Sequence, residues 1–195
     1  MQKTQRQLQK EQTRNSIIEA AFIEFAKNGI ISTKTSDIAN AANVSHGTIF
    51  SHFPNKEILI DEVILEFKTI IATRLHELSL GSCKIREILK AHLIGISEYE
   101  DFYTRLILES RMLNKSARNT VISLQSTIAV HIIEIAEKDM IKGSIKNMSL
   151  DMFFNTWLGL VHYYLLNSDL FGREGLFYER HGELLIEHFL NLIRK

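Results

Sequence analysis

The sequence predicts an all-α protein: a three-helix N-terminal domain with a helix-turn-helix, then a larger helical domain, about nine helices in all. Three observations support this fold class. The 195 residues include only one proline and nine glycines. Long segments repeat apolar residues every three or four positions, which is typical of helices packed on a core. Two short helical segments between residues 28 and 57 are separated by only three residues, the spacing of a helix-turn-helix.

The first predicted helix carries Ile17, Ala21 and Phe25 on one face and ends at Asn28-Gly29, where glycine favours a C-terminal cap. Four Lys or Arg residues lie at positions 3, 6, 10 and 14. We interpret residues 1–13 as a flexible basic arm, which is either a solvated tail or a contact to a polyanion.

The predicted helix-turn-helix follows. Thr35 is placed to cap a helix over 36–42, with Asp37 favourable in its first turn. Asn43-Val44-Ser45 forms the turn, and Ser45 caps a second helix to about Ser51. Within that helix Ile49 and Phe53 are spaced to pack inward. Further helices are expected at roughly 56–80, 84–98, 101–113, 116–140, 149–167 and 175–193.

Charge and composition exclude several classes of protein. Lys+Arg and Asp+Glu are both 23, so any nucleic-acid contact must come from a local basic surface. One cysteine, Cys83, excludes a disulfide framework and fits a reducing compartment. The N-terminus has no apolar core of a signal peptide, and the apolar stretch 153–166 is too short and interrupted to span a membrane. We therefore expect a cytoplasmic protein without a membrane contact.

The residues around the helix-turn-helix resemble the DNA-binding domain of the TetR/AcrR family of one-component transcriptional regulators. The resemblance covers roughly residues 14–65. It rests on Ile18, Ala21, Phe25, Gly29, the run 35–39, Ala42, Val44-Ser45, Gly47-Thr48-Ile49-Phe50, His52-Phe53, Lys56-Glu57 and Leu59. It implies a domain of residues 1–56 that binds DNA and a domain of residues 57–195 that binds a ligand and dimerises.

The same resemblance implies which residues contact DNA. They are Thr35, Ser36, Ser45, His46, Gly47, Thr48, Phe50, Ser51, His52 and Lys56. His46, Gly47 and Thr48 would face base edges, while His52 and Lys56 would hold the backbone. His46 and His52 could also be ordinary surface histidines. Two positions depart from the family pattern. Asn43 replaces a usual glycine and tolerates the left-handed turn, and Phe50 replaces a usual tyrosine and could contact a thymine methyl.

The larger domain gives weaker signals. Polar residues interrupt apolar helices, as in a small-molecule site. The predicted ligand-binding residues are His92, Ile96, Tyr103, Leu106, Gln125, Ile128, His131, Asn155, Leu158 and His162. The three histidines lie on separate helices without carboxylate or cysteine at ligand spacing, so we expect no metal and no cofactor. No nucleophile–base pair or catalytic motif indicates an enzyme.

The last two long helices are apolar on more than one face, which favours a homodimer. The predicted interface residues are Phe154, Trp157, Val161, Leu165, Leu185, His188, Phe189 and Leu192. With these patterns, the resemblance to the TetR/AcrR family implies a homodimeric repressor that binds a pseudo-palindromic double-stranded operator and is released by a small, lipophilic or aromatic effector. The alternative is a DNA-binding regulator or adaptor whose helical body binds a protein partner.

Overall fold

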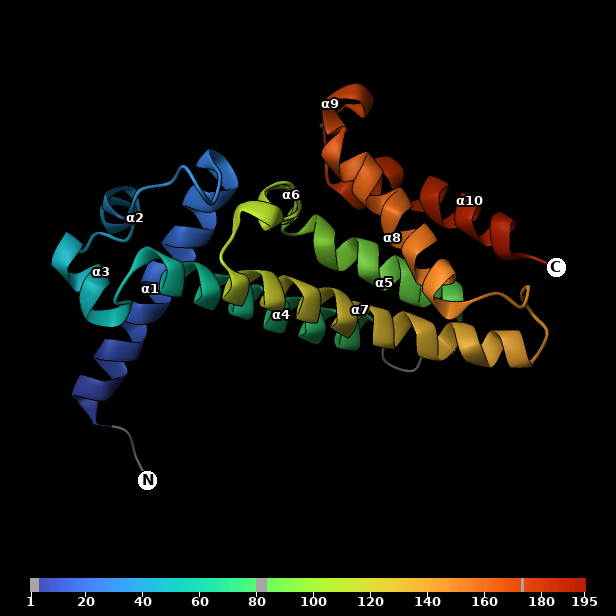
Figure 1. Ribbon diagram of the computed structural model, residues 1–195, viewed down its shortest axis with the longest axis horizontal. Helices are drawn as coiled ribbons and strands as arrows, with labels where there is room; N and C mark the ends of the chain where they lie inside the picture. Colours follow the sequence, from blue (N-terminus) through green and yellow to red (C-terminus); the bar gives the residue numbers. More distant parts are fainter. Residues whose placement is uncertain (1–3, 80–83, 173) are drawn as a thin grey trace. The chain divides into compact units, whose positions relative to one another are not determined.

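The computed structural model describes residues 4–79, 84–172 and 174–195, and Cys83 lies outside them. The described residues form helices and turns and no strand, which confirms the all-α prediction. The helices are α1 (Gln5–Asn28), α2 (Thr35–Ala41), α3 (His46–His52), α4 (Lys56–Ser79), α5 (Ile85–Ser97), α6 (Glu100–Glu109), a 3₁₀ turn (Ser110–Met112), α7 (Lys115–Ile141), α8 (Leu150–Leu166), α9 (Ser168–Phe171), a π-helical turn (Tyr178–Gly182) and α10 (Glu183–Ile193) (Figure 1).

Packing divides the chain into two compact units. The first comprises residues 1–67 and 101–121, and the second comprises residues 68–100 and 122–195. The chain passes between the units within three helices, α4, α6 and α7. The predicted boundary between a DNA-binding domain (residues 1–56) and a ligand-binding domain (residues 57–195) stays a prediction. It falls at the start of α4, which runs without a break from Lys56 to Ser79.

In the first unit, α1, α2 and α3 pack on a shared apolar core. Ile17, Phe25, Ile49 and Phe53 are almost fully buried, as the helical spacing predicted, and Ile38 is buried beside them. The core also takes in α6, whose Phe102 ring lies 4.5 Å from the Phe22 ring on α1. Each large apolar side chain buried in this way stabilises the folded state by about 1.5–3 kcal/mol relative to leaving it exposed.

The N-terminal arm differs from its prediction. Residues 5–13, expected to be flexible, form the first turns of α1. The Thr4 hydroxyl accepts the Gln7 amide N–H, and the Gln7 side chain accepts the Thr4 N–H at 2.8 Å. This reciprocal capping box satisfies donors that a helix start otherwise leaves unpaired, so the helix begins well before its apolar face. The other end is as predicted: α1 stops at Gly29, whose φ of +88° suits glycine.

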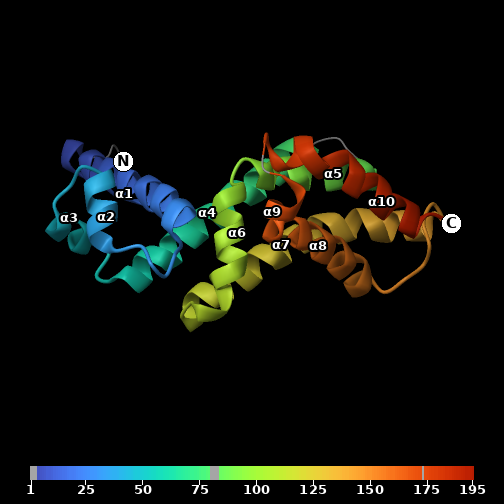
Figure 2. The same cartoon turned by 90° about the horizontal axis from the view of Figure 1, so that it is seen from above.

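In the second unit, α5, α8 and α10 enclose an aromatic core. Figure 2 shows α10 beside α5. The Phe189 ring of α10 lies 5.1 Å from the Phe153 ring and 5.2 Å from the Trp157 ring, both on α8. These edge-on and tilted pairs, together with area burial, hold α8 and α10 together.

Among the helices of the described residues, one is long and apolar enough to cross a membrane. It is α7, and 28% of its apolar window is buried. A core helix of a water-soluble protein meets the same two criteria. Leu124, Ile128, Ile132 and Ala136 are buried at four-residue spacing along α7, which is the pattern of a packed amphipathic helix.

Candidate functional site

The predicted DNA-contact residues form a polar surface on α2, α3 and the start of α4. Ser45 caps α3 as predicted, since its Oγ accepts the Thr48 amide N–H at 3.1 Å. The same Oγ lies 2.8 Å from the Thr48 hydroxyl. Ile49 is buried on the inner face, so the outer face presents short polar groups. A helix with one apolar face held by its neighbours and a polar outer face has the form needed to enter a major groove.

The turn before α3 keeps the geometry that the family pattern requires. Asn43 has a φ of +53° and is the one described residue other than glycine with a positive φ. Asparagine tolerates this left-handed conformation better than most residues do. The departure from glycine therefore preserves the turn.

The first helix of the helix-turn-helix, α2, begins differently from its prediction. Thr35 was expected to be the cap, but Lys34 is the capping residue and Thr35 is the first helical residue. The Asp37 carboxylate accepts the Lys34 amide N–H at 3.1 Å, so the acidic first turn supplies the capping contact. The Thr35 hydroxyl lies instead 2.8 Å from the Nε2 of His46. This bond joins the starts of α2 and α3.

Two aromatic rings lie on the outer face of α3. Phe50 is 42% exposed, and its ring lies 4.9 Å from the His46 ring in an edge-on arrangement. An exposed phenyl ring beside polar side chains is able to contact a thymine methyl group. Contacts of the His46 side chain with Thr35 and with Phe50 thus bring three of the predicted DNA-contact residues together, and their contact with DNA stays a prediction.

Lys56 and His52 lie at the rim of this surface. The Lys56 ammonium donates to the Ile31 carbonyl at 2.7 Å, and burial lowers its pKa although Glu57 and Glu109 act in the opposite direction. Burial also lowers the pKa of His52, with further lowering from Lys10 and Arg14. The neutral form of His52 is therefore favoured over the cation, and Lys56 also holds the loop between α1 and α2.

That loop has a second anchor, which the sequence did not indicate. The carboxylate of Glu109, at the end of α6, accepts the Ile31 amide N–H at 2.7 Å. The Ile31 backbone is thus held on one side by Glu109 and on the other by Lys56. A partner 78 residues away leaves no local spacing signal, so sequence patterns could not find it.

The predicted ligand-binding residues do not all lie in one unit. Tyr103 and Leu106 are buried in the first unit, and the other eight belong to the second. Of those eight, His92, Ile96, Ile128 and Leu158 are buried, Gln125, His131 and His162 are half-buried, and Asn155 is exposed on α8. The exposed Asn155 faces away from the core that the buried residues form.

His92 is the most unusual polar group in the second unit. It is almost fully buried, and the Trp157 indole N–H donates to its Nδ1 at 3.1 Å. Burial, with a smaller effect of His162, lowers the pKa of His92 to about 3. The imidazole is therefore neutral, and because Nδ1 accepts, its proton is on Nε2. Among the described residues this buried Nε2–H has no hydrogen-bond partner.

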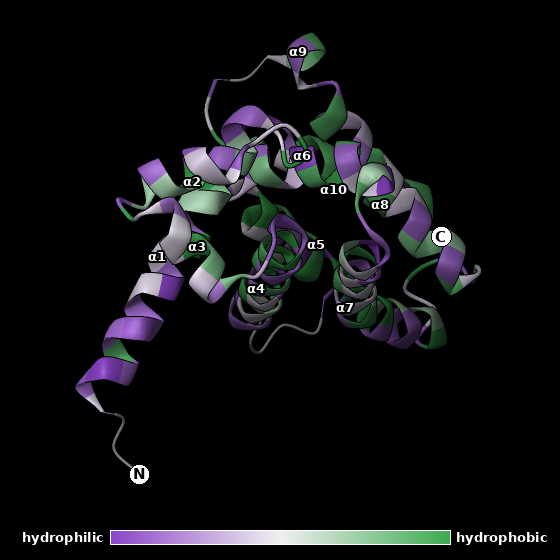
Figure 3. Cartoon of the chain, turned by 60° about the vertical axis from the view of Figure 1, so that its left-hand side comes forward, coloured by the Kyte–Doolittle hydropathy of each residue, from purple (hydrophilic) through white to green (hydrophobic). Residues whose placement is uncertain are grey.

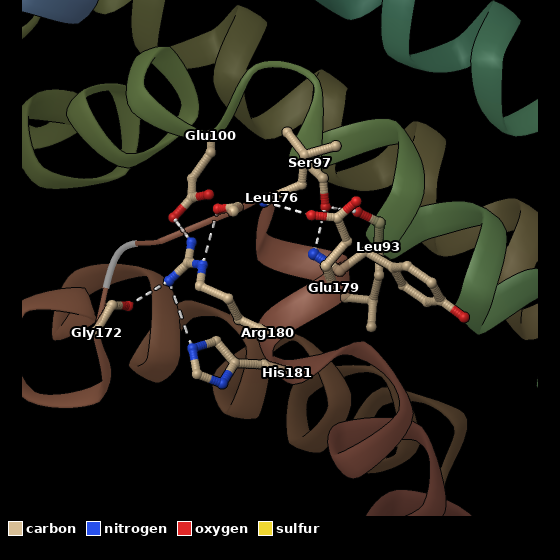
Figure 4. Close-up of polar contacts among 10 residues, drawn as sticks. Leu93, Ser97, Glu100, Gly172, Leu176, Glu179, Arg180 and His181 are labelled. Atoms are coloured by element: carbon tan, nitrogen blue, oxygen red, sulfur yellow. Dashed lines mark hydrogen bonds and ion pairs between the residues drawn. The ribbon is translucent and has the colours of Figure 1, made fainter.

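A second polar cluster holds the π-helical turn before α10 (Figure 4). Arg180, which is 9% exposed, forms an ion pair with Glu100 and donates to the carbonyls of Gly172 at 2.7 Å and Gly175 at 3.1 Å. The Tyr178 amide donates to Ser97 Oγ at 2.8 Å. These contacts fasten the segment before α10 to the end of α5.

The predicted interface residues lie mostly inside the protomer. Phe154, Trp157, Val161, Leu165, Leu185 and Phe189 are each at most 7% exposed and pack its core. His188 and Leu192 are exposed. The spacing of apolar residues predicted that α8 is apolar on two faces. It did not indicate which of these faces α5 and α10 cover. On α8 the uncovered face carries Met152, Tyr163 and Leu166, which are 62%, 54% and 36% exposed.

Residues 17–63 match the model of a family described as bacterial regulatory proteins of the tetR family. The chain is 29% identical over 137 residues to a probable acrEF/envCD operon repressor of Escherichia coli K12, covering 69% of this chain and 54% of that protein. The chain thus spans about half the length of that relative.

Solved structures share the fold. A TetR-family regulator from Agrobacterium tumefaciens aligns with a TM-score of 0.79 at 15% identity, over 95% of this chain and all of the other. FadR from Bacillus subtilis, solved in complex with stearoyl-CoA, aligns with a TM-score of 0.76 at 20% identity, over 90% of this chain and 96% of the other. The helix-turn-helix region therefore matches the tetR family of bacterial regulatory proteins, and the chain has the fold of solved TetR-family regulators.

Proposed function

We propose that the protein is a DNA-binding transcriptional repressor that recognises a pseudo-palindromic operator as a homodimer. The observation that carries the proposal is the outer face of α3, where His46, Thr48 and Phe50 are presented on a capped helix. A single helix of seven residues contacts too few base pairs for specificity, so two copies on adjacent half-sites are needed.

The second copy has an available surface in the second unit. Met152 and Tyr163 on α8 and Leu184 on α10 are 62%, 54% and 61% exposed. A Cβ added at Gly159, which lies between them on α8, would meet nothing within 4 Å. An apolar face of this kind, next to the packed faces of α8 and α10, is expected to be covered by its two-fold copy.

The effector is proposed to bind in the second unit near His92. A buried N–H without a partner costs about 1–3 kcal/mol. A ligand that offers an oxygen or nitrogen acceptor to His92 Nε2 would recover that cost while its apolar part contacts the surrounding core. The effector class is therefore a small, lipophilic or aromatic molecule with a hydrogen-bond acceptor. The protein itself is proposed to be cytoplasmic.

The test is affinity selection of fragmented genomic DNA from the source organism on the purified protein at near-physiological salt. Enrichment of one pseudo-palindromic motif, bound by two protomers in sedimentation, is the expected result. The Thr48→Ala variant should change the selected motif more than the overall affinity, because Thr48 faces base edges in this arrangement. Recovery of unrelated fragments in proportion to their abundance would contradict specific operator binding.

A further inference from the structure

The first turns of α1 form a polar helix with no apolar face to pack. Between Gln5 and Ser16 nearly every residue is exposed, including the lone large apolar residue Leu8 at 47%. Figure 3 shows this part of α1 coloured mainly as hydrophilic. A helix that is polar all round is not stabilised by burial, and here it projects beyond the core that starts at Ile17.

Three cations occupy one face of this segment. Arg6, Lys10 and Arg14 follow one another at intervals of four residues, which places them one above the other on a helix. Eight residues at 1.5 Å each give the row a length of about 12 Å. We call these three residues the α1 basic row. Among the described residues, no acidic side chain forms an ion pair with Arg6 or Lys10.

The Arg14 end of the α1 basic row lies beside α3. Arg14 forms an ion pair with Glu62, and its guanidinium lies 5.4 Å from the centre of the Phe53 ring, directly after α3. Lys10 and Arg14 both lie close enough to His52, at the end of α3, to lower its pKa. The row therefore continues the predicted DNA-contact surface away from α3 along α1.

We propose that the α1 basic row binds the phosphate backbone of duplex DNA next to each operator half-site, with Arg6 and Lys10 as the contacting residues. Charge complementarity selects this partner, because Arg6 and Lys10 lie about 6 Å apart along α1, and phosphates along one strand are spaced by about 3.4 Å of helix axis, so the two cations are able to reach neighbouring phosphates. Such contacts position the protein without reading sequence. The inference rests on the proposed function and enlarges its footprint beyond the bases that α3 reaches.

The test combines a protein change with a DNA change. The full-length Arg6→Gln/Lys10→Gln variant keeps good helix formers at both positions, and circular dichroism checks that helicity is retained. Binding is measured on the selected operator with about ten flanking base pairs on each side, and on the same operator trimmed to its core. The wild type should bind the long duplex more tightly than the trimmed one. The variant should bind both alike, with the affinity that the wild type shows for the trimmed duplex.

Salt dependence gives an independent readout. Loss of two phosphate contacts from each protomer should flatten the slope of log affinity against log salt on the long duplex by about 3.6. Lys27→Gln, at the far end of α1 and on another face, is the matched control and should keep the wild-type slope. Trimming that weakens wild type and variant equally would overturn the role of the row while leaving operator binding intact. Absence of binding to either duplex by the wild type would overturn the proposed function as well.

Discussion

The recognition surface on α3 and the core of the second unit use their polar side chains in different ways. On α3 the hydrogen bonds are exposed and local, such as Ser45 to Thr48, three residues apart. In the core of the second unit two such bonds are distant: the buried Trp157 donates to a histidine 65 residues away, and the partly buried Arg180 pairs with a carboxylate 80 residues away. Local bonds between exposed groups contribute little stability but fix the shape of a contact surface. Buried, distant bonds hold a core together and are costly to break.

The largest expected effect comes from breaking the partly buried ion pair between Arg180 and Glu100. Arg180→Met leaves the Glu100 carboxylate largely buried without its partner, which should reduce the free energy of unfolding by about 3–5 kcal/mol. Urea denaturation measures this. Arg86→Met is the matched control, because Arg86 forms ion pairs with Glu183 and Glu187 at the surface of the same unit. Such exposed pairs contribute about 0–1 kcal/mol.

A double variant sharpens the first prediction. Adding Glu100→Gln to Arg180→Met removes the unpaired charge and should restore a large part of the lost stability. If Arg180→Met and Arg86→Met proved equally mild, the contrast drawn between buried and exposed polar contacts would be wrong.

The second prediction concerns pH. Burial lowers the pKa of His92 to about 3 and that of His162 to about 4, both below the unfolded value of 6.5. Below pH 6.5 the unfolded chain binds protons that the folded protein does not, so stability falls as the pH decreases toward about 4. Each histidine contributes a slope of up to about 1.4 kcal/mol per pH unit.

Urea denaturation between pH 7.5 and 5 checks the effect, above the range in which most carboxylates titrate. The His92→Leu variant should show a shallower dependence of unfolding free energy on pH than the wild type. His188→Leu, which replaces an exposed histidine on α10, should leave the dependence unchanged. A wild-type slope retained in His92→Leu would show that His92 is protonated as easily in the folded protein as in the unfolded chain.

The smallest expected change in stability comes from the cap of α3. Ser45→Ala removes the side chain that accepts the Thr48 amide and should lower the unfolding free energy by about 1 kcal/mol. Ser45→Asn retains a capping acceptor and should remain close to the wild type. Thermal denaturation of the three proteins measures the difference. A loss as large as that of Arg180→Met would mean that the exposed contacts of α3 and the distant contacts in the core of the second unit do not differ in this way.

The sequence by itself determined the helix-turn-helix and its outer face. Caps such as Ser45, the left-handed Asn43 and the inward pair Ile49 and Phe53 depend on spacings of a few residues, so local patterns are sufficient to predict them. The same local signals predicted the long helices of the second unit. The basic row was present in the sequence as a four-residue spacing, although the absence of apolar residues there favoured a flexible arm over a helix.

The tertiary structure decided which face of each apolar helix is covered and which distant groups meet. Residues such as Trp157 and Phe189 have the pattern of an interface residue and of a core residue equally, and only the packing of α8 against α5 and α10 placed them inside. The contacts of Glu109 with Ile31 and of Arg180 with Glu100 likewise join segments about 80 residues apart. Periodicity specifies the angle of a side chain around its own helix axis. It does not specify what lies on the other side, because that depends on how the whole chain packs.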